Sequence, residues 1–473
     1  MKAIAFVLSI LFGFVLVTSY LGMDGLSMLV FGVATVLLFQ GAFASYAMLY
    51  TFLEKKNRDR VRAPKLLFGQ PVDTFSLIIP ARHEERVIGD TLHAMANIDY
   101  PKDKYEVLVV VREDDKKTIK EVKKAIKKLG SSHSSTIGGV MASTSLQPAT
   151  PEVSLLPDIR LITFDGYPIN KPHALNVGLS HAKYNIVGIF DAEDEPHKTI
   201  LSTIDTTFSH SSADVVQAAV QLVNVASHWY SALNSLEYYF WFKSVLPLFS
   251  GMGSTPLGGN TVFFKKSALR HASGWDEAIL TEDADMGLRL SAAGFKIATV
   301  YEEKLATREE TPADLSGFIR QRSRWNQGFL QVLFKGSWTK LPKARQQILT
   351  LYLLLQPVIH HFAILGFLFI PFFALGAHVP LWLSLYSFIP MYFFILQLML
   401  ALLGLADLGK RYKISFSPSL YFVLLGMYFP YQFVLSYASF RGFGRFLIGI
   451  LHWEKTMHIN VHRMALSRNK VTI

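Results

Sequence analysis

The chain reads NIVGIFDAEDEP from residue 185 to residue 196, a short apolar run that ends in a cluster of acids. A continuous apolar run of this length predicts a strand that is buried on both faces. Carboxylates placed directly after such a strand repel one another unless a cation or hydrogen-bond donors neutralise them. Asp191 and Glu193 form an acid–x–acid pair of the hard oxygen ligands that Mg²⁺ or Mn²⁺ uses when it bridges phosphates. An acidic turn that caps the next helix is the alternative interpretation.

Similar apolar runs occur on the N-terminal side of this stretch and predict a layered α/β domain. We expect three further strands: 75–79 (FSLII), 106–111 (EVLVVV) and 159–164 (IRLITF). Segments with helical spacing lie between them, for example Val87, Ile88, Leu92 and Met95. Continuous rather than alternating apolar strands favour a mostly parallel sheet that is covered on both faces. Ligands of such sheets bind beyond the carboxyl ends of the strands, which is where the acids after residue 190 are expected.

The two ends of the chain differ in composition from this central domain. The 473 residues are 51% hydrophobic, include 36 phenylalanines and have a mean hydropathy of +0.28, which favours contact with lipid. Apolar stretches at 4–21 and 27–53 predict a transmembrane hairpin, because the second is long enough to span unaided and no clear cleavage site marks the first as a signal peptide. Three more apolar runs follow the domain: 348–375, 379–405 and 416–438. The last contains Pro430, so it is either re-entrant or one of a pair of short spans with 441–453.

The basic residues of the chain indicate which segments face the cytoplasm, rather than a nucleic-acid-binding site. The formal net charge is +11, and basic residues cluster beside the apolar runs, at Lys55 to Lys65 and at Lys410 to Lys413. This is the positive-inside bias of cytoplasmic segments, and it also attracts anionic lipid headgroups. The lysines between Lys116 and Lys128 are interpreted as the solvated face of an amphipathic helix. The chain has no cysteine, which excludes disulfides, thiol catalysis and Cys-ligated metal.

Two further groups of residues have the composition of functional sites. Glu282 and Asp283 follow Thr281 ahead of a helical pattern, so they are either N-terminal carboxylates favoured by the helix dipole or a free base for a hydroxyl nucleophile. The stretch from Gln321 to Trp325 (QRSRW) combines donors, an amide and a flat apolar ring, a mixture that binds carbohydrate. An interfacial helix anchored by Arg and Trp is the alternative.

Taken in order, these elements resemble one family. The ordered motifs are Pro80-Ala81-Arg82-His83-Glu84-Glu85, Glu113-Asp114-Asp115, Lys171-Pro172-His173-Ala174-Leu175-Asn176, Asp191-Ala192-Glu193, Gly258-Gly259-Asn260, Thr281-Glu282-Asp283 and Gln321-x-x-Arg324-Trp325. This set resembles the processive family-2 glycosyltransferases, which include the cellulose, hyaluronan, chitin and poly-N-acetylglucosamine synthases. The resemblance covers about residues 72–330 and the membrane flanks. It implies a nucleotide-sugar-binding domain of the GT-A type.

The resemblance also implies a role for each matched residue. The uridine of a UDP-sugar would be held by Glu84, Glu113, Asp114 and Asp115. Lys171 would meet the diphosphate, and Asp191 and Glu193 would bind Mg²⁺ or Mn²⁺. Asp283, beside Glu282, would be the general base for inverting attack on the anomeric carbon. The acceptor end and the leaving nucleotide would contact Gln321, Arg324 and Trp325, while Trp453 and Lys455 in a Trp-x-Lys-Thr-like element would close over the nucleotide.

The sequence departs from the family pattern at two places, which leaves the donor sugar open. His83 stands where the family usually has Asn, and the usual Asp-x-Asp is Asp191-Ala192-Glu193 followed by Asp194. Asp194 is either a further metal ligand or a residue that supports the metal ligands without binding the metal itself. His360 and His361 lie in an apolar run and are either functional or a polar contact inside the helix bundle.

The expected protein is therefore a multi-pass enzyme of the plasma membrane with its catalytic domain in the cytoplasm. The expected division is a hairpin at 1–53, a GT-A domain at 54–316, interfacial helices at 317–346, transmembrane helices at 347–440 and a tail at 441–473. The expected reaction extends a β-linked polysaccharide and exports it through the membrane helices. A single-sugar transferase acting on a lipid and a catalytically silent receptor or scaffold are the alternatives. Any co-polymerase or regulatory subunit would be a separate chain, and no nucleic-acid partner is expected.

Overall fold

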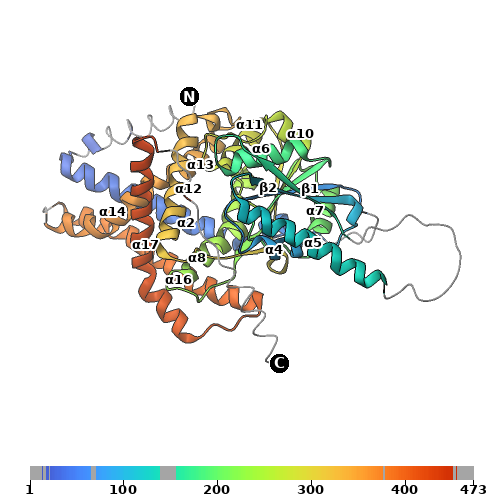
Figure 1. Ribbon diagram of the computed structural model, residues 1–473. Coiled ribbons are helices and arrows are strands. Elements are labelled where there is room, and N and C mark those ends of the chain that lie inside the picture. The colour runs from blue at the N-terminus through green and yellow to red at the C-terminus, as the bar shows by residue number, and fades with distance from the viewer. Residues whose placement is uncertain are drawn as a thin grey trace.

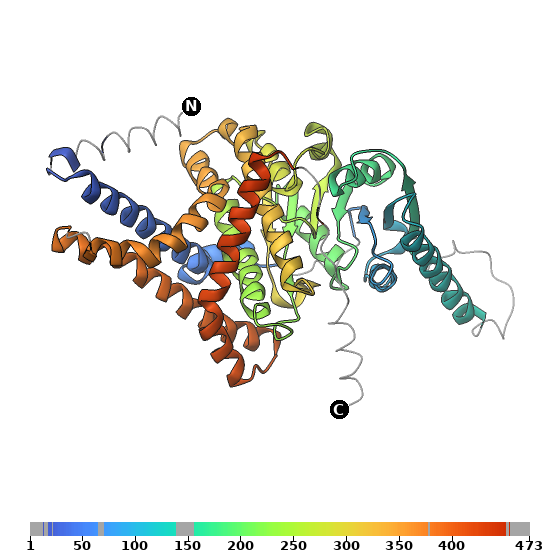
Figure 2. The ribbon, with the colours of Figure 1, turned by 60° about the vertical axis from the view of Figure 1, so that its left-hand side comes forward.

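The computed structural model describes residues 13, 18–20, 22–64, 71–138, 156–376, 379–450 and 454. Within them the α/β domain lies on one side and a group of long helices lies on the other (Figures 1 and 2). The expected second apolar stretch is helix α2 (Gly25–Leu53). The first, at 4–21, lies almost entirely outside the described residues, as do Trp453 and Lys455.

The domain is built on a mixed sheet of seven strands with the order β3-β2-β1-β4-β7-β5-β8. The four predicted strands are confirmed and are all parallel: β1 (Phe75–Ala81), β2 (Tyr105–Arg112), β3 (Asp158–Phe164) and β4 (Ile186–Ile189). Strand β7 (Val262–Lys265) runs antiparallel between β4 and β5 (Val215–Ala218), and β8 (Ile297–Val300) is parallel to β5. The expectation of a mostly parallel sheet is correct.

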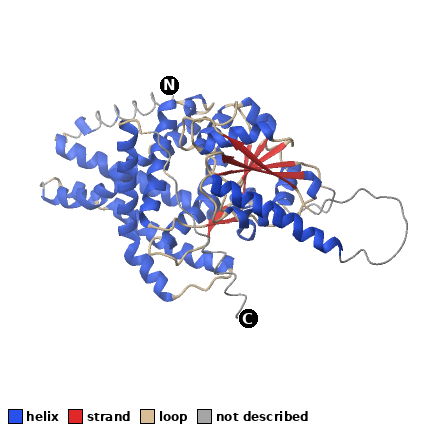
Figure 3. Cartoon of the chain, in the orientation of Figure 1, coloured by secondary structure: helices blue, strands red, loops and turns tan. Residues whose placement is uncertain are grey.

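Helices cover both faces of this sheet, as the continuous apolar strands predict (Figure 3). Alternate side chains along a strand point to opposite faces. Leu77 and Ile79 pack in one core with helices α4 (Ile88–Ala96) and α7 (Ile200–His210). Ile78 packs in a second core with α6 (Lys171–His181), α10 (Lys266–His271) and α11 (Glu282–Ala292).

Helix α5 (Lys116–Gly138) confirms the solvated basic face, because its lysines are exposed while Val122 and Leu129 are buried. The Ser, Thr, Gly and Pro residues of 130–157 predict a flexible surface insertion. This prediction is wrong for 130–138, where α5 continues without a break. Residues 139–155 lie outside the described part.

The sheet places several motifs at one edge. Because Ala81 pairs with Val111 and Ile78 with Ile189 in parallel register, the residues after β1, β2 and β4 all emerge at the same end. A small second sheet adjoins this edge, formed by β6 (Val220–Leu222) and β9 (Thr307–Glu309). An isolated bridge between Glu195 and Arg308 joins β9 to the acidic turn after β4.

Three described helical segments are long and apolar enough to cross a membrane: α2, the pair α15 (Leu381–Ser387) and α16 (Ile389–Tyr412), and α17 (Pro418–Leu447). Helix α13 (Ala344–Leu354) and the first part of α14 (Gln356–Gly376) pass the same test together but are bent by 62°. Large apolar side chains on these helices are exposed, including Phe369, Leu403 and Phe422, as expected for contact with lipid.

Helix α17 settles the open interpretation of the last apolar run. It continues through Pro430 from Pro418 to Leu447, so within the described residues the run is neither re-entrant nor divided before residue 441. A proline is tolerated inside an apolar helix when neighbouring groups accommodate the carbonyl that loses its partner.

The helices that connect the domain to this group are α8 (Ser231–Phe240), α9 (Leu246–Met252) and α12 (Leu315–Lys335), with a π-helical turn at Trp241–Val245 between the first two. Asp314 caps α12 by accepting a hydrogen bond from Gly317 N. Helix α17 packs closely along α12, since a Cβ on Gly442 would lie 2.7 Å from the backbone oxygen of Ser323. The shorter elements are α3 (Lys55–Val61), η1 (Lys102–Lys104), η3 (Glu303–Leu305) and η4 (Ser337–Lys340).

Candidate active site

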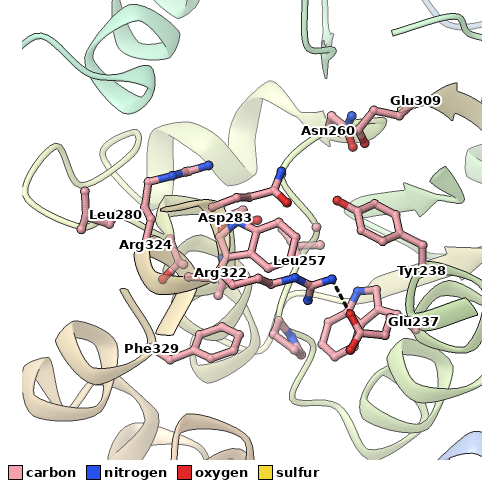
Figure 4. Close-up of a pocket in the computed structure, with 18 of the residues that line it drawn as sticks. Glu237, Tyr238, Leu257, Asn260, Leu280, Asp283, Glu309, Arg322, Arg324 and Phe329 are labelled. Carbon is pink, nitrogen blue, oxygen red and sulfur yellow. Dashed lines mark hydrogen bonds and ion pairs between the residues drawn. The ribbon is translucent and has the colours of Figure 1, made fainter. Parts of the chain in front are cut away.

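A cavity of about 620 Å³ opens at the edge of the sheet where the parallel strands end. Its wall includes residues after β1 and β4, the starts of α6 and α11, and the middle of α12 (Figure 4). It also extends between α2, α14, α16 and α17, whose lining residues include Gln40, Gln356, His360 and Gln397. One continuous cavity therefore joins the acidic edge of the sheet to the apolar helices.

Lys171 is the cation at the centre of the acids. Asn170 caps helix α6, and Lys171 is the first residue of that helix. Its ammonium lies 2.5 Å from Asp191 Oδ1 and donates to the backbone oxygen of Gly259 at 2.8 Å. Burial alone would lower the pKa of Lys171, but Asp191 and Glu282 raise it above its ordinary value, so this side chain is a cation.

Glu282 and Asp283 stand at the first turn of α11 and both line the cavity. Burial and the neighbouring carboxylate of Asp283 raise the pKa of Glu282 to about 7. Burial also raises the pKa of Asp283, against the opposing effect of a hydrogen bond from Ala284 N. Gly259 leaves the room these groups need, because a Cβ there would lie 3.3 Å from Asp283 Oδ2 and 3.5 Å from Lys171 Nζ.

Two further buried acids, Asp194 and Glu309, lie near the Asp191–Glu193 pair, and Glu309 also lines the cavity. Asp194 accepts hydrogen bonds from Asp191 N and from Asn260 Nδ2, both at 2.8 Å. Burial together with the charges of Asp191 and Glu193 raises the pKa of both Asp194 and Glu309. Asp194 thus fixes the turn that carries Asp191.

The excess of acid at this edge suits a divalent cation. Four carboxylates, those of Asp191, Glu193, Asp194 and Glu309, lie near one lysine, and their oxygens are the hard ligands that Mg²⁺ and Mn²⁺ prefer. Among the described residues no group of three acids or histidines is arranged to hold a metal ion without help. The donor set therefore fits a cation that takes part of its coordination from a bound diphosphate.

The Gln321–Trp325 motif lines the opposite wall from helix α12. Gln321, Arg324 and Trp325 all border the cavity, and the buried Gln321 Oε1 has no hydrogen-bond partner in the part of the chain that the structure describes. The structure therefore brings two predicted groups to one cavity (Figure 4). One is the Gln321–Trp325 motif of α12, and the other is the pair of acids at the start of α11.

The predicted uridine-binding residues are divided between the cavity and its surroundings. Glu84 borders the cavity. Asp114 pairs instead with Arg82 and Arg112, and Glu113 is exposed beyond β2. Buried Asp115 accepts hydrogen bonds from the backbone N–H groups of His83 and Thr118 and so organises the loop after β1. A uridine-binding role for these acids stays a prediction.

Sequence reasoning missed several residues of the wall. Glu309 lies in a segment without a motif, and Glu237 and Tyr238 lie in an aromatic run (LEYYFWF) that looks like an ordinary packed helix. Arg322 was within the recognised motif but was given no role. The one available signal was the acid placed inside an otherwise apolar run.

Comparison with known proteins decides the family. The model of the family described as "Glycosyltransferase like family 2" matches residues 71–145 and 149–328, which together exceed half of the chain. The chain belongs to glycosyltransferase family 2. It is accordingly a glycosyltransferase, and the matched residues include all the cavity-lining motifs between β1 and α12.

Curated relatives with different names are similarly distant from this chain. Beta-monoglucosyldiacylglycerol synthase of Synechocystis is 26% identical over 280 residues, covering 57% of this chain and 51% of that protein, so the chain matches about half the length of this relative. Probable glycosyltransferase YdaM of Bacillus subtilis is 22% identical over 448 residues, covering 90% and 94%. Poly-beta-1,6-N-acetyl-D-glucosamine synthase of Staphylococcus epidermidis is 22% identical over 317 residues, covering 65% and 66%.

Among solved structures, the mannosyltransferase PcManGT from Pyrobaculum calidifontis in complex with GDP-Man and Mn²⁺ has a TM-score of 0.53 to this family-2 chain. The two are 18% identical, and the match covers 89% of this chain and 99% of that one. This similarity confirms the GT-A-like fold expected from the sequence.

The contact between helices α11 and α12 of this family-2 fold gives a first prediction. A Cβ on Gly328 of α12 would lie 2.5 Å from Thr281 Cγ2 and 2.8 Å from Thr281 N, directly before Glu282. We expect Gly328→Ala to destabilise the protein by about 1–3 kcal/mol and to lower transfer, because Thr281 must shift. Thermal unfolding and nucleotide release would be measured. Gly130→Ala on exposed α5, where nothing lies within 4 Å, is the control and should unfold no earlier than wild type.

The raised pKa of Glu282 gives a second prediction. The folded-state value of about 7 exceeds the ordinary 4.5, so the stabilising contribution of the bound proton is complete below pH 4.5 and is lost as the pH rises through 7. We expect Glu282→Gln to be more stable than wild type at pH 8, by about 1–3 kcal/mol, and equally stable near pH 4.5. Thermal unfolding at both pH values would test this. A pH-independent difference between Glu282→Gln and wild type would contradict it. Glu121→Gln on the surface of α5 is the control.

Proposed function

We propose that the chain transfers a sugar from a UDP-sugar to the terminal hydroxyl of a growing β-linked glycan at the membrane. The observation that carries this proposal is the continuity of the cavity. It begins at Lys171, Asp191 and Asp283 and ends between the apolar helices, where amides and a histidine line it. Beside apolar and aromatic side chains, the membrane-side lining includes four amides and a histidine: Gln40, Gln356, His360, Gln397 and Gln432. Amide groups both donate and accept hydrogen bonds, which suits the hydroxyls of a saccharide chain.

The residues at the acidic edge then divide the chemistry between them. Asp191 and Glu193 would hold Mg²⁺ or Mn²⁺, which supplies charge stabilisation to the leaving diphosphate. Lys171 binds the same diphosphate as a fixed cation. Asp283 takes the proton from the acceptor hydroxyl as that oxygen attacks the anomeric carbon, and inversion follows from attack opposite the leaving group. Arg324 faces Asp283 across the cavity and adds positive charge beside the leaving nucleotide (Figure 4).

The placement of charge supports a multi-pass protein with a cytoplasmic domain. Lys410, Arg411 and Lys413 lie at the end of α16, and the basic helix α3 follows α2. Both positions adjoin the catalytic domain, and basic residues favour the cytoplasmic side. The glycan would then leave the site between α2, α14, α16 and α17.

A lipid acceptor is the second candidate, and two observations favour it. Beta-monoglucosyldiacylglycerol synthase is among the relatives, and by its name it makes a glycolipid. A smaller cavity of about 140 Å³ adjoins the first between α12, α14 and α17, where its lining includes Asn326, Phe329, Leu435 and Ser439. A lipid headgroup would reach Trp325 by this route.

Product analysis of the purified full chain in nanodiscs separates the two candidates. The protein would be incubated with Mg²⁺ or Mn²⁺ and, in turn, UDP-glucose, UDP-N-acetylglucosamine and UDP-glucuronate. Nucleotide release with a high-molecular-weight product supports the glycan acceptor. Release with only a single-sugar lipid supports the second candidate. Absence of release with every donor and both metals would contradict the proposed function.

A further inference from the structure

A partly buried ion pair in the cavity wall has no part in the mechanism above. Arg322 on α12 donates hydrogen bonds to the carboxylate of Glu237 and to Asn234 Oδ1, both on α8. Figure 4 shows the Arg322 side chain extending across the pocket toward Glu237. The side chain of Arg322 is 14% exposed and that of Glu237 is 34% exposed. The carboxylate is therefore the partner that remains accessible in the cavity.

Aromatic rings surround this pair. The guanidinium carbon of Arg322 lies 4.6 Å from the ring centre of Trp325 and 5.1 Å from that of Phe318. The ring of Tyr238 lies 6.4 Å from that of Trp325, tilted by 43°. Arg322 thus holds both a carboxylate and an indole ring in place, while Trp325 and Tyr238 both border the cavity. A carboxylate beside flat apolar rings is the combination that binds sugar hydroxyls and C–H faces together.

Several buried polar atoms of the cavity wall have no hydrogen-bond partner among the described residues, and two of them lie close to this ion pair along the wall. They are Gln321 Oε1, from a side chain that is 6% exposed, and His360 Nε2, from helix α14. Buried polar atoms are nearly always hydrogen-bonded, so such atoms in a cavity wall indicate a polar ligand. The charges of Arg322 and Glu237 balance each other, which favours a neutral ligand over a second ion.

We propose that Glu237, held by Arg322, is an acceptor-binding residue that accepts hydrogen bonds from the hydroxyls of a neutral saccharide. Trp325 and Tyr238 contact the C–H faces of the same saccharide, and Gln321 and His360 bind its remaining hydroxyls. This subsite rests on the proposed function, since it lies between the acids at the sheet edge and the membrane helices. Arg322 is a positioning residue, because it acts through Glu237 and Trp325.

The test compares Glu237→Gln with wild type in the full chain, with two separate readouts. One is hydrolysis of the nucleotide sugar without acceptor, measured as nucleotide release. This rate depends on donor binding and on the acids at the reacting centre. The other is transfer to a soluble β-linked tetrasaccharide of the donor sugar. We expect the acceptor KM of Glu237→Gln to rise by about tenfold or more, as for the loss of one charge-assisted hydrogen bond, while hydrolysis and donor KM stay within about twofold.

The matched control is Glu303→Gln, which also removes an acid from a partly buried ion network. Glu303 pairs with Lys243 and Arg411 and does not border the cavity, so its acceptor KM should equal that of wild type. An unchanged acceptor KM in Glu237→Gln, or an equal fall in hydrolysis and transfer, would overturn the proposal and leave a purely structural ion pair. A chain that transfers to lipid but never to the tetrasaccharide would also overturn it.

Loss of the proposed function and loss of folding in the variant give different results from loss of the subsite. If wild type releases no nucleotide, the proposed function fails before the subsite is tested. If Glu237→Gln does not fold, Glu237→Asp carries the test, because it keeps the charge and withdraws the carboxylate by one methylene. Its acceptor KM should lie between those of wild type and the expected Glu237→Gln value, and a wild-type value would contradict the subsite.

Discussion

Asp283→Asn should lower the rate of sugar transfer by about 10²- to 10⁴-fold while nucleotide-sugar binding stays within about threefold of wild type. The amide keeps the shape of the side chain and can still accept the hydrogen bond from Ala284 N that the carboxylate accepts at 2.8 Å. It cannot take a proton from a hydroxyl. Transfer would be measured as nucleotide release with acceptor present, and binding by calorimetry.

The control for this experiment is Asp276→Asn. Asp276 lies in the loop before α11 and pairs with Lys335 at 2.6 Å, outside the cavity. Its replacement should leave the transfer rate nearly unchanged. If Asp283→Asn retained more than a tenth of the wild-type rate, the base would have to be another group, and Glu282 would be the first to examine.

Asp191→Asn should raise the Mn²⁺ or Mg²⁺ concentration needed for half-maximal activity by about tenfold or more, because it removes one charged oxygen ligand. Chelation with EDTA should abolish nucleotide release by wild type, and added metal should restore it. The same substitution removes the partner that lies 2.5 Å from Lys171 Nζ. Metal titration at fixed donor concentration is the measurement.

Glu302→Gln is a suitable comparison, since Glu302 pairs with Lys304 at 2.9 Å and does not border the cavity. It should leave the metal requirement unchanged. An unaltered requirement in Asp191→Asn, or full activity of wild type in EDTA, would exclude Asp191 as a metal ligand.

The sequence predicted those strands of the sheet that a local run of apolar residues marks. Strands β1 to β4 were recognised because each is a short, continuous apolar run, and their parallel order places their ends together by a general rule. Asp191 lines the cavity because it follows β4 at those ends. Lys171, Asp283 and Trp325 lie on helices α6, α11 and α12, and the ordered motifs of the family resemblance singled them out. Their chemical roles remain predictions.

The remaining features of the fold and of the cavity wall depend on contacts between residues that are far apart in the sequence. Arg322 forms an ion pair with Glu237, 85 positions earlier, and the acid inside an aromatic run of α8 does not by itself reveal which residue is its partner. The antiparallel insertion of β7 between β4 and β5 is likewise a matter of topology rather than of composition. Pro430 was a misleading signal, because its cost inside a helix falls when neighbouring groups accommodate it.

The close packing of α17 on α12 has a mechanical consequence. Gly442 allows the two backbones to touch, and Arg445 Nε donates to Gln327 Oε1 at 3.0 Å one turn further along. A helix of 30 residues is about 45 Å long and exceeds the hydrocarbon thickness of a bilayer, so in the proposed membrane protein α17 would adapt to thinner membranes by tilting. Because α17 packs against α12, which carries Arg324 and Trp325, tilting of α17 would displace α12. A change in bilayer thickness would therefore shift these two side chains in the cavity.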